Sequence, residues 1–194
     1  MTEAAVTVSR TTKETDISVS LFQKGTGSID TQLPFFDHML GAMAFHGGFG
    51  LTLKARGDIG VDYHHLVEDT GLVLGEAFHK LLEKNKAVRR FGQALIPMDE
   101  ALSEAVIDTA ERACLVYRAE FPQEQAGNFP LALIKEFFYA FTQKARINLH
   151  LWCRYGDNSH HMAEALFKAF GKALAQAYAP AEGSREDMST KGAL

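Results

Sequence analysis

The sequence contains the motif His-His-x-x-Glu twice, in matching local settings. The first copy lies in "VDYHHLVEDTG" (61–71) and the second in "NSHHMAEALFKAFG" (158–171). An offset of 96 residues superimposes both histidines and the glutamate, and it also pairs Gly75 with Gly171. A strand-like segment precedes each copy, "LTLKA" or "INLHLW", and a segment with Phe-Phe precedes each of these, "PFFDHML" or "KEFFYAF". The chain is therefore predicted to be an internal duplication with a period of about 90 residues.

Hydrophobic periodicity predicts strands and helices in a similar order in the two halves. Strands are expected at 17–25, within 50–65, on both sides of a break within 105–121, and at 146–156. Helices are expected at 35–48, 64–85, 131–145 and 158–179, the first of them ended by Gly-Gly. We place the first half-repeat at residues 1–95 and the second at 96–194.

Length and charge exclude several classes of protein. A chain of 194 residues fits one medium domain or two small halves of one domain. The net charge of −4 argues against a nucleic-acid partner, and no apolar run is long enough to span a bilayer. Cys114 and Cys153 are isolated, so we expect free thiols and a cytoplasmic protein.

The duplicated motif indicates metal binding. Residues three or four apart share a helix face, so Glu68 can lie beside His64 or His65. Adjacent residues point about 100° apart, so the two histidines cannot easily serve one ion. Two copies therefore suggest two ions, with imidazole and carboxylate donors that favour manganese or iron. The alternative is that the histidines are only polar residues at helix N-termini, and His38 and His46 are further candidate ligands.

Eight segments together resemble the imidazoleglycerol-phosphate dehydratase family. They are "TKETDISVSL", "FFDHML", "VDYHHLVEDTG", "RRFG", "PMDEAL", "EFFYAF", "NSHHMAEALFKAF" and "STKG", in family order from about residue 10 to the C-terminus. The resemblance implies an α+β fold made by duplication of two similar halves, each a four-stranded sheet backed by helices (ribosomal protein S5 domain 2-like). It also implies a homo-oligomer of 24 subunits.

The resemblance implies specific roles for individual residues. Two Mn²⁺ ions per subunit would be held by His38, His64, His65, Glu68, Glu136, His160, His161 and Glu164. The catalytic groups would be Glu14 as the base, His46 beside the departing hydroxide, and Asp99 as a second candidate base. Glu14 and His46 would also contact the substrate. Its phosphate would be bound by Arg90, Arg112, Ser189, Thr190 and Lys191.

The implied activity is that of a lyase of histidine biosynthesis. It would dehydrate D-erythro-imidazole-glycerol phosphate to imidazole-acetol phosphate. Two other functions remain open from the residues alone. One is a dinuclear metallohydrolase of a small phosphate ester, and the other is a metal-storage or assembly protein in which the two motifs join subunits.

Overall fold

The two halves of the chain fold into two similar sets of strands and helices. The structure, a computed structural model, describes residues 5–85, 87–184 and 188. The first half contains β1 (Val6–Thr11), β2 (Thr15–Phe22), β3 (Ile29–Asp30), α1 (Pro34–Gly47), β4 (Gly50–Gly57) and α2 (His64–Lys84). The second contains β5 (Phe91–Met98), β6 (Ala101–Asp108), β7 (Cys114–Arg118), β8 (Gln125–Ala126), β9 (Phe129–Pro130), α3 (Leu133–Ala145), β10 (Asn148–Tyr155) and α4 (Ser159–Ala177).

Each half forms a four-stranded sheet with the same topology. The strand orders are β1-β2-β4-β3 and β5-β6-β10-β7. In both sheets the first three strands pair antiparallel, and the fourth runs parallel to its neighbour, β3 to β4 and β7 to β10. The hairpin of β8 and β9 is an addition to the second half. The predicted duplicated α+β fold is confirmed.

One face of each sheet is apolar because buried and exposed residues alternate along the strands. In β2, Ile17, Val19 and Leu21 are buried while the residues between them face outward. In β6, Ala105 and Ile107 alternate in the same way with half-buried residues. A sheet with one apolar face must cover that face with another layer. The four helices form that layer.

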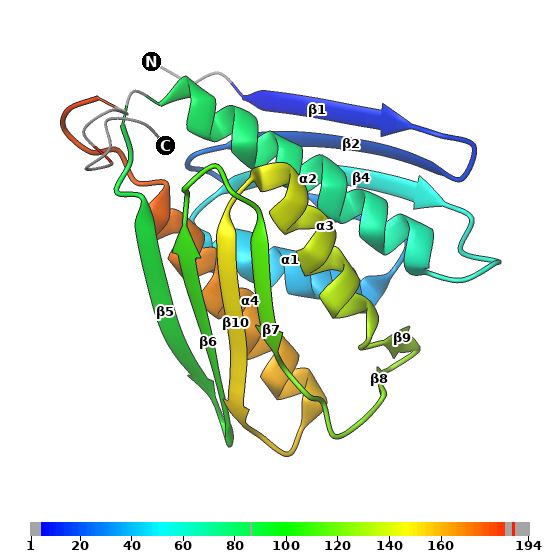
Figure 1. The fold of residues 1–194 in the computed structure, drawn as a ribbon. Coiled ribbons are helices and arrows are strands. Elements are labelled where there is room, and N and C mark those ends of the chain that lie inside the picture. The colour runs from blue at the N-terminus through cyan, green and yellow to red at the C-terminus, as the bar shows by residue number, and fades with distance from the viewer. Residues whose placement is uncertain (1–4, 86, 185–187, 189–194) are drawn as a thin grey trace.

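The four helices lie between the two sheets, and helices of one half pack against helices of the other half (Figure 1). Helix α2 packs on β1 and β2, and α4 packs on β5 and β6. Across the middle, α2 packs against α3 of the second half, and α4 packs against α1 of the first half. The N-terminal end of each helix that carries His-His-x-x-Glu is therefore next to a helix from the other half.

The glycine that repeats with the motif permits this close helix packing. A Cβ atom on Gly75 of α2 would lie 2.4 Å from the carbonyl oxygen of Phe141 in α3. A Cβ atom on Gly171 of α4 would lie 2.2 Å from the carbonyl oxygen of Met43 in α1. Both distances are too short for any side chain. The sequence match between Gly75 and Gly171 thus reflects equivalent helix crossings.

The helices begin and end close to the predicted positions, whereas β1, β3, β5, β8 and β9 were not predicted. The division expected between residues 95 and 96 falls inside β5. The sheets divide the chain earlier, within 85–90. Cys114 and Cys153 are both free thiols. Among the described residues, no helix is long and apolar enough to cross a membrane.

Candidate active site

Two histidines and a carboxylate from both halves meet where α4 begins. His38 comes from the second turn of α1, and His160 and Glu164 come from the start of α4. The Nε2 atoms of His38 and His160 lie 3.1 and 3.2 Å from the same oxygen, Oε2 of Glu164. One ligand atom from each residue lies within 4.8 Å of the other two. We call these three residues the metal group, because two imidazoles and a carboxylate at this spacing suit a divalent transition metal.

The carboxylate of Glu164 is held in its ionised form. It is buried, and its second oxygen lies 2.8 Å from Nζ of Lys168. Burial by itself raises the pKa of Glu164, but hydrogen bonds from Lys168 and His38 outweigh it and lower the pKa to about 2. A buried anion beside two imidazoles favours a cation at this position.

Local hydrogen bonds fix the starts of both helices that build the metal group, and in α4 they include a side-chain cap. Pro34 occupies the first turn of α1, and the backbone N–H and hydroxyl of Thr31 donate to Asp37 Oδ1 over 2.7 and 2.6 Å. In α4, Asn158 is the N-cap, and its Oδ1 accepts from the backbone N–H of His160 over 2.9 Å. The cap of α4 satisfies amides that have no partner within the helix. The sequence "NSHH" therefore sets the position of the histidines as well as the start of the helix.

The motif of the first half has the same internal pairing. Nε2 of His64 lies 3.3 Å from Oε2 of Glu68, one helical turn away. His65 points elsewhere, and its ring plane is inclined 81° to that of His64. Its Nδ1 atom lies 3.2 and 3.1 Å from the two carboxylate oxygens of Asp58 and 3.9 Å from Oε2 of Glu14.

His161 also diverges from its neighbour and contacts carboxylates. The ring planes of His160 and His161 are inclined at 89°. Nδ1 of His161 lies 2.8 Å from Oε2 of Glu100, and its Nε2 lies 3.7 Å from Oδ2 of Asp99. The hydrogen bond from His161, with further ones from backbone amides, lowers the pKa of Glu100 to about 2. Adjacent histidines therefore face different surroundings in both motifs.

Glu136 occupies the position in α3 that His38 occupies in α1. The buried side chains Phe36, Met39, Leu40 and Met43 of α1 match Ile134, Phe137, Phe138 and Phe141 of α3 at a constant offset of 98. The same offset takes His38 to Glu136, and α3 packs on α2 as α1 packs on α4. Glu136, His64 and Glu68 are thus the counterparts of the metal group. Among the described residues, however, only the metal group brings three ligand atoms together.

His46 lies in the last turn of α1. It is eight residues beyond His38, or about 12 Å along the helix axis. Burial lowers the pKa of His46, and the nearby charges of Lys168 and Lys172 lower it further. His46 is therefore mainly neutral at pH 7, with one nitrogen able to donate and the other able to accept.

Of the expected phosphate-binding residues, Arg90 and Arg112 lie at the opposite end of α4 from the metal group. The backbone N–H of Arg90 donates to the carbonyl oxygen of Ala177, the last residue of α4. Its guanidinium donates to Asp108 over 2.8 and 3.2 Å and to the carbonyl oxygen of Met188 over 2.6 Å. Arg112 is exposed in the loop that follows β6, at this same end. Ser189, Thr190 and Lys191 lie outside the described residues.

Asp58 and Glu100 are candidate site residues that sequence reasoning missed. Both stand in short acid-rich stretches, "GDIGVDYHH" and "PMDEAL", close to residues that the motif identified. The duplication gave no signal for them because they come from different places. Asp58 follows β4, whereas Glu100 lies in the turn between β5 and β6.

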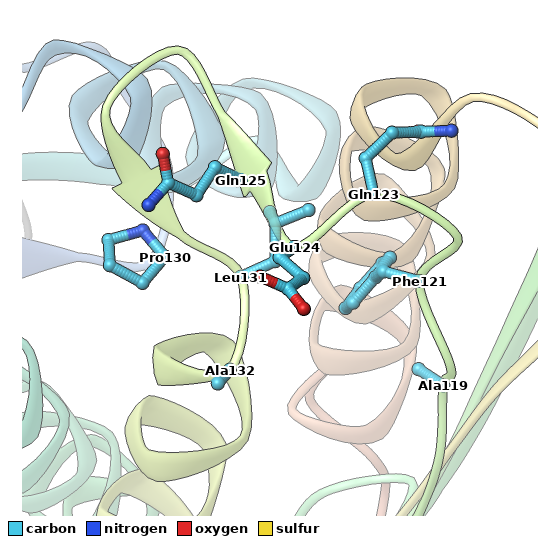
Figure 2. Close-up of a pocket in the computed structure, with 8 residues that line it drawn as sticks. All are labelled: Ala119, Phe121, Gln123, Glu124, Gln125, Pro130, Leu131 and Ala132. Carbon is cyan, nitrogen blue, oxygen red and sulfur yellow. The ribbon is translucent and has the colours of Figure 1, made fainter.

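Two pockets lie beside the short hairpin of β8 and β9. The first, of about 500 Å³, is formed by the segment after β7, the hairpin and the residues before α3 (Figure 2). None of its lining residues was a candidate from the sequence. The second, of about 390 Å³, is formed by 123–127 and 157–160 and includes His160. Through His160, this pocket opens beside the metal group.

Comparisons with known proteins agree over nearly the whole chain. The family model of imidazoleglycerol-phosphate dehydratase matches residues 31–174, a range that contains all eight expected metal ligands. The imidazoleglycerol-phosphate dehydratase of Gluconobacter oxydans is 47% identical over 188 residues, 95% of each chain. The crystal structure of the Staphylococcus aureus imidazoleglycerol-phosphate dehydratase superimposes with a TM-score of 0.84 at 34% identity, and the match covers 91% of this chain and 99% of that one. The Pyrococcus furiosus structure also has a TM-score of 0.84, at 37% identity, covering 96% and 99%.

Proposed function

Because this chain belongs to the imidazoleglycerol-phosphate dehydratase family of hydro-lyases in histidine biosynthesis, we propose that it works with two manganese ions per subunit. In this proposal it dehydrates D-erythro-imidazole-glycerol phosphate to imidazole-acetol phosphate in the cytoplasm. The observation that carries the proposal is the metal group, in which His38, His160 and Glu164 converge without a sulfur ligand. A ligand set of imidazole and carboxylate without thiolate is more typical of a manganese site than of a closed structural zinc site.

The second ion would use the counterparts of the metal group. Glu136, His64 and Glu68 hold equivalent helix positions, and His64 already lies 3.3 Å from Glu68. His65 and His161 turn away from their neighbours, so they are available to ions other than those held by His64 and His160. Divergence of adjacent histidines in both motifs supports two ions rather than one.

When bound, the metal supplies Lewis-acid chemistry and an orienting template for the imidazole ring of the substrate. The groups of the chain then have to move protons. Glu14 lies in the turn between β1 and β2, its side chain is 57% exposed, and its carboxylate is 3.9 Å from His65. It can therefore reach a substrate held beside His65 and take the proton from carbon. His46, neutral at pH 7, can donate a hydrogen bond to the departing hydroxyl group.

The position of the phosphate-binding residues supports a homo-oligomer. Arg90 lies at the C-terminal end of α4 and the metal group at its N-terminal end. A helix of 19 residues is about 28 Å long at 1.5 Å per residue. That length exceeds a small phosphate ester, so one chain cannot offer both ends to one substrate. We infer that a neighbouring copy supplies Arg90 and Arg112, within an assembly for which the family resemblance implies 24 subunits.

Product analysis of the purified protein tests the proposal. With imidazole glycerol phosphate and Mn²⁺, nuclear magnetic resonance should show loss of both hydroxyl-bearing carbon signals and appearance of a methylene and a ketone. His160→Ala should abolish this conversion. The matched control His150→Ala, on the exposed face of β10, should retain it. Release of inorganic phosphate would instead support the metallohydrolase function, and metal binding without turnover would support a storage role.

A further inference from the structure

We propose that Asp58 and Glu100 are positioning residues that fix the ring orientation and tautomer of His65 and His161, so that Nε2 of each histidine is available to a metal ion. The inference rests on the proposed metal-dependent function. It adds Asp58 and Glu100 to the proposed site and separates acidic side chains that orient histidines from the one, Glu14, that contacts the substrate. Histidine ligands generally need a partner on the second ring nitrogen, and removal of that partner weakens metal binding.

Asp58 holds His65 from the loop between β4 and α2. Both its carboxylate oxygens lie within 3.2 Å of Nδ1 of His65. A carboxylate only accepts hydrogen bonds, so Nδ1 must carry the proton and a neutral ring has its free lone pair on Nε2. Two backbone hydrogen bonds hold the loop: Asp58 N–H donates to the carbonyl oxygen of Glu14 over 3.1 Å, and Val61 N–H donates to that of Asp58 over 2.8 Å. The carboxylate is therefore held at a defined place.

Glu100 holds His161 from the turn between β5 and β6. Its Oε2 lies 2.8 Å from Nδ1 of His161. Its other oxygen, Oε1, accepts the backbone N–H groups of Asp157 and Asn158 over 3.2 and 2.8 Å. Asn158 in turn caps α4 by accepting from His160. One carboxylate thus fixes both the ring of His161 and the loop that starts its helix.

The duplication shows why Glu14 and Glu100 have different tasks. Both stand in the turn between the first two strands of their sheets. Glu100 is hydrogen-bonded to Nδ1 of His161. The carboxylate of Glu14 stays 3.9 Å from Nδ1 of His65, because that atom is already hydrogen-bonded to Asp58. In the first half, Asp58 therefore orients the histidine. The carboxylate of Glu14, in the turn, stays available for the substrate.

Titration of the metal-free protein with Mn²⁺ by calorimetry tests these separate roles of Asp58, Glu100 and Glu14. Asp58→Ala and Glu100→Gln should each weaken Mn²⁺ binding at least about tenfold. The side-chain amide introduced by Glu100→Gln has one carbonyl oxygen, which cannot accept from the backbone amides and the imidazole together. Asp58→Asn keeps an acceptor and should recover part of the affinity. Glu14→Gln should bind Mn²⁺ like the parent yet lose turnover. Asp62→Asn is the matched control, because it removes a second negative charge that acts on His65, while the hydrogen bond of Asp62 is to the backbone N–H of His64 and not to the imidazole of His65.

A second measurement does not depend on activity or on metal. Nitrogen NMR of the metal-free protein should show His65 and His161 protonated at Nδ1, and Asp58→Ala should change this for His65 alone. Equal Mn²⁺ affinity in the parent, Asp58→Ala and Glu100→Gln would overturn the inference. If the parent itself binds no Mn²⁺, the proposed function fails. If Asp62→Asn weakens binding as much as Asp58→Ala, loss of charge rather than orientation explains the effect, and the inference is again overturned.

Discussion

Asp69 is a buried carboxylate that ties the first sheet to α2 beside the site. It accepts hydrogen bonds from the hydroxyl of Thr15 in β2 and from Nε of Arg10 in β1. Thr12, in the turn before Thr15, accepts the backbone N–H groups of both Glu14 and Thr15 over 3.1 and 2.9 Å. The turn that carries Glu14 is therefore anchored to the helix that carries His65. The repeat places Ala165 opposite Asp69, so the duplication could not indicate this link.

Thr15→Val should destabilise the protein by about 1–3 kcal/mol, because it removes the hydroxyl donor while leaving the buried carboxylate of Asp69 in place. Thr7→Val is the matched control. Thr7 lies in β1, its hydroxyl is exposed, and its contact with the hydroxyl of Ser20 is 3.4 Å long. Its free energy of unfolding should change by less than about 0.5 kcal/mol. Denaturant titration measures both, and equal losses for the two variants would contradict the anchoring role.

Element by element, the sequence predicted the helices better than the strands, for physical reasons. Long amphipathic helices repeat their apolar positions many times, as α2 and α4 do. β1 and β5 are edge strands, and β5 contains Pro97, which weakens a strand pattern. The motif spacing predicted that each Glu would lie by a His on one helix face. It could not predict that His38 would join His160 and Glu164, because that contact depends on the packing of α1 against α4.

Gly75→Ala should destabilise the protein by about 1–3 kcal/mol or more, because its Cβ would overlap the backbone of α3 and force the helices apart. Gly41→Ala is the control, and it should change the free energy of unfolding in the opposite direction. Gly41 lies within α1 and a Cβ there meets nothing within 4 Å, so alanine should stabilise the helix by about 0.5–1 kcal/mol. Both are measured by denaturation at one fixed protein concentration, since subunit association affects stability. Stabilisation by Gly75→Ala would contradict the close helix crossing.

For the whole molecule, removal of metal should weaken association between copies. If an ion takes ligands from two chains, its binding energy also holds those chains together. Dialysis against a chelator, followed by light scattering, should therefore give smaller species than the untreated protein. Adding Mn²⁺ should restore the original size, whereas Mg²⁺, which prefers oxygen ligands, should not. An unchanged particle after verified loss of metal would show that the copies associate without shared ions.

The separation of the two ends of α4 leads to a sharper test on mixed assemblies. Arg90→Ala and His160→Ala should each inactivate the protein, the first at the phosphate end and the second at the metal group. When the two variants are unfolded, mixed in equal amounts and refolded together, their subunits should assemble at random. If each site combines the metal group of one copy with Arg90 of another, about a quarter of the sites contain both intact parts. Activity should then recover to roughly that fraction of the parent.

If instead one chain supplied both parts, every site in the mixture would carry one defect and activity would stay at the level of the separate variants. Two controls make this comparison decisive. Each variant refolded alone should remain inactive, and the parent refolded alone should regain full turnover. Dissociating the mixed assembly by chelation, and reassociating it with an excess of His160→Ala subunits, should lower the recovered activity again, because fewer metal groups are then intact. The geometry of α4 predicts recovery in the equal mixture, since the distance from His160 to Arg90 within one chain is too great for one small substrate.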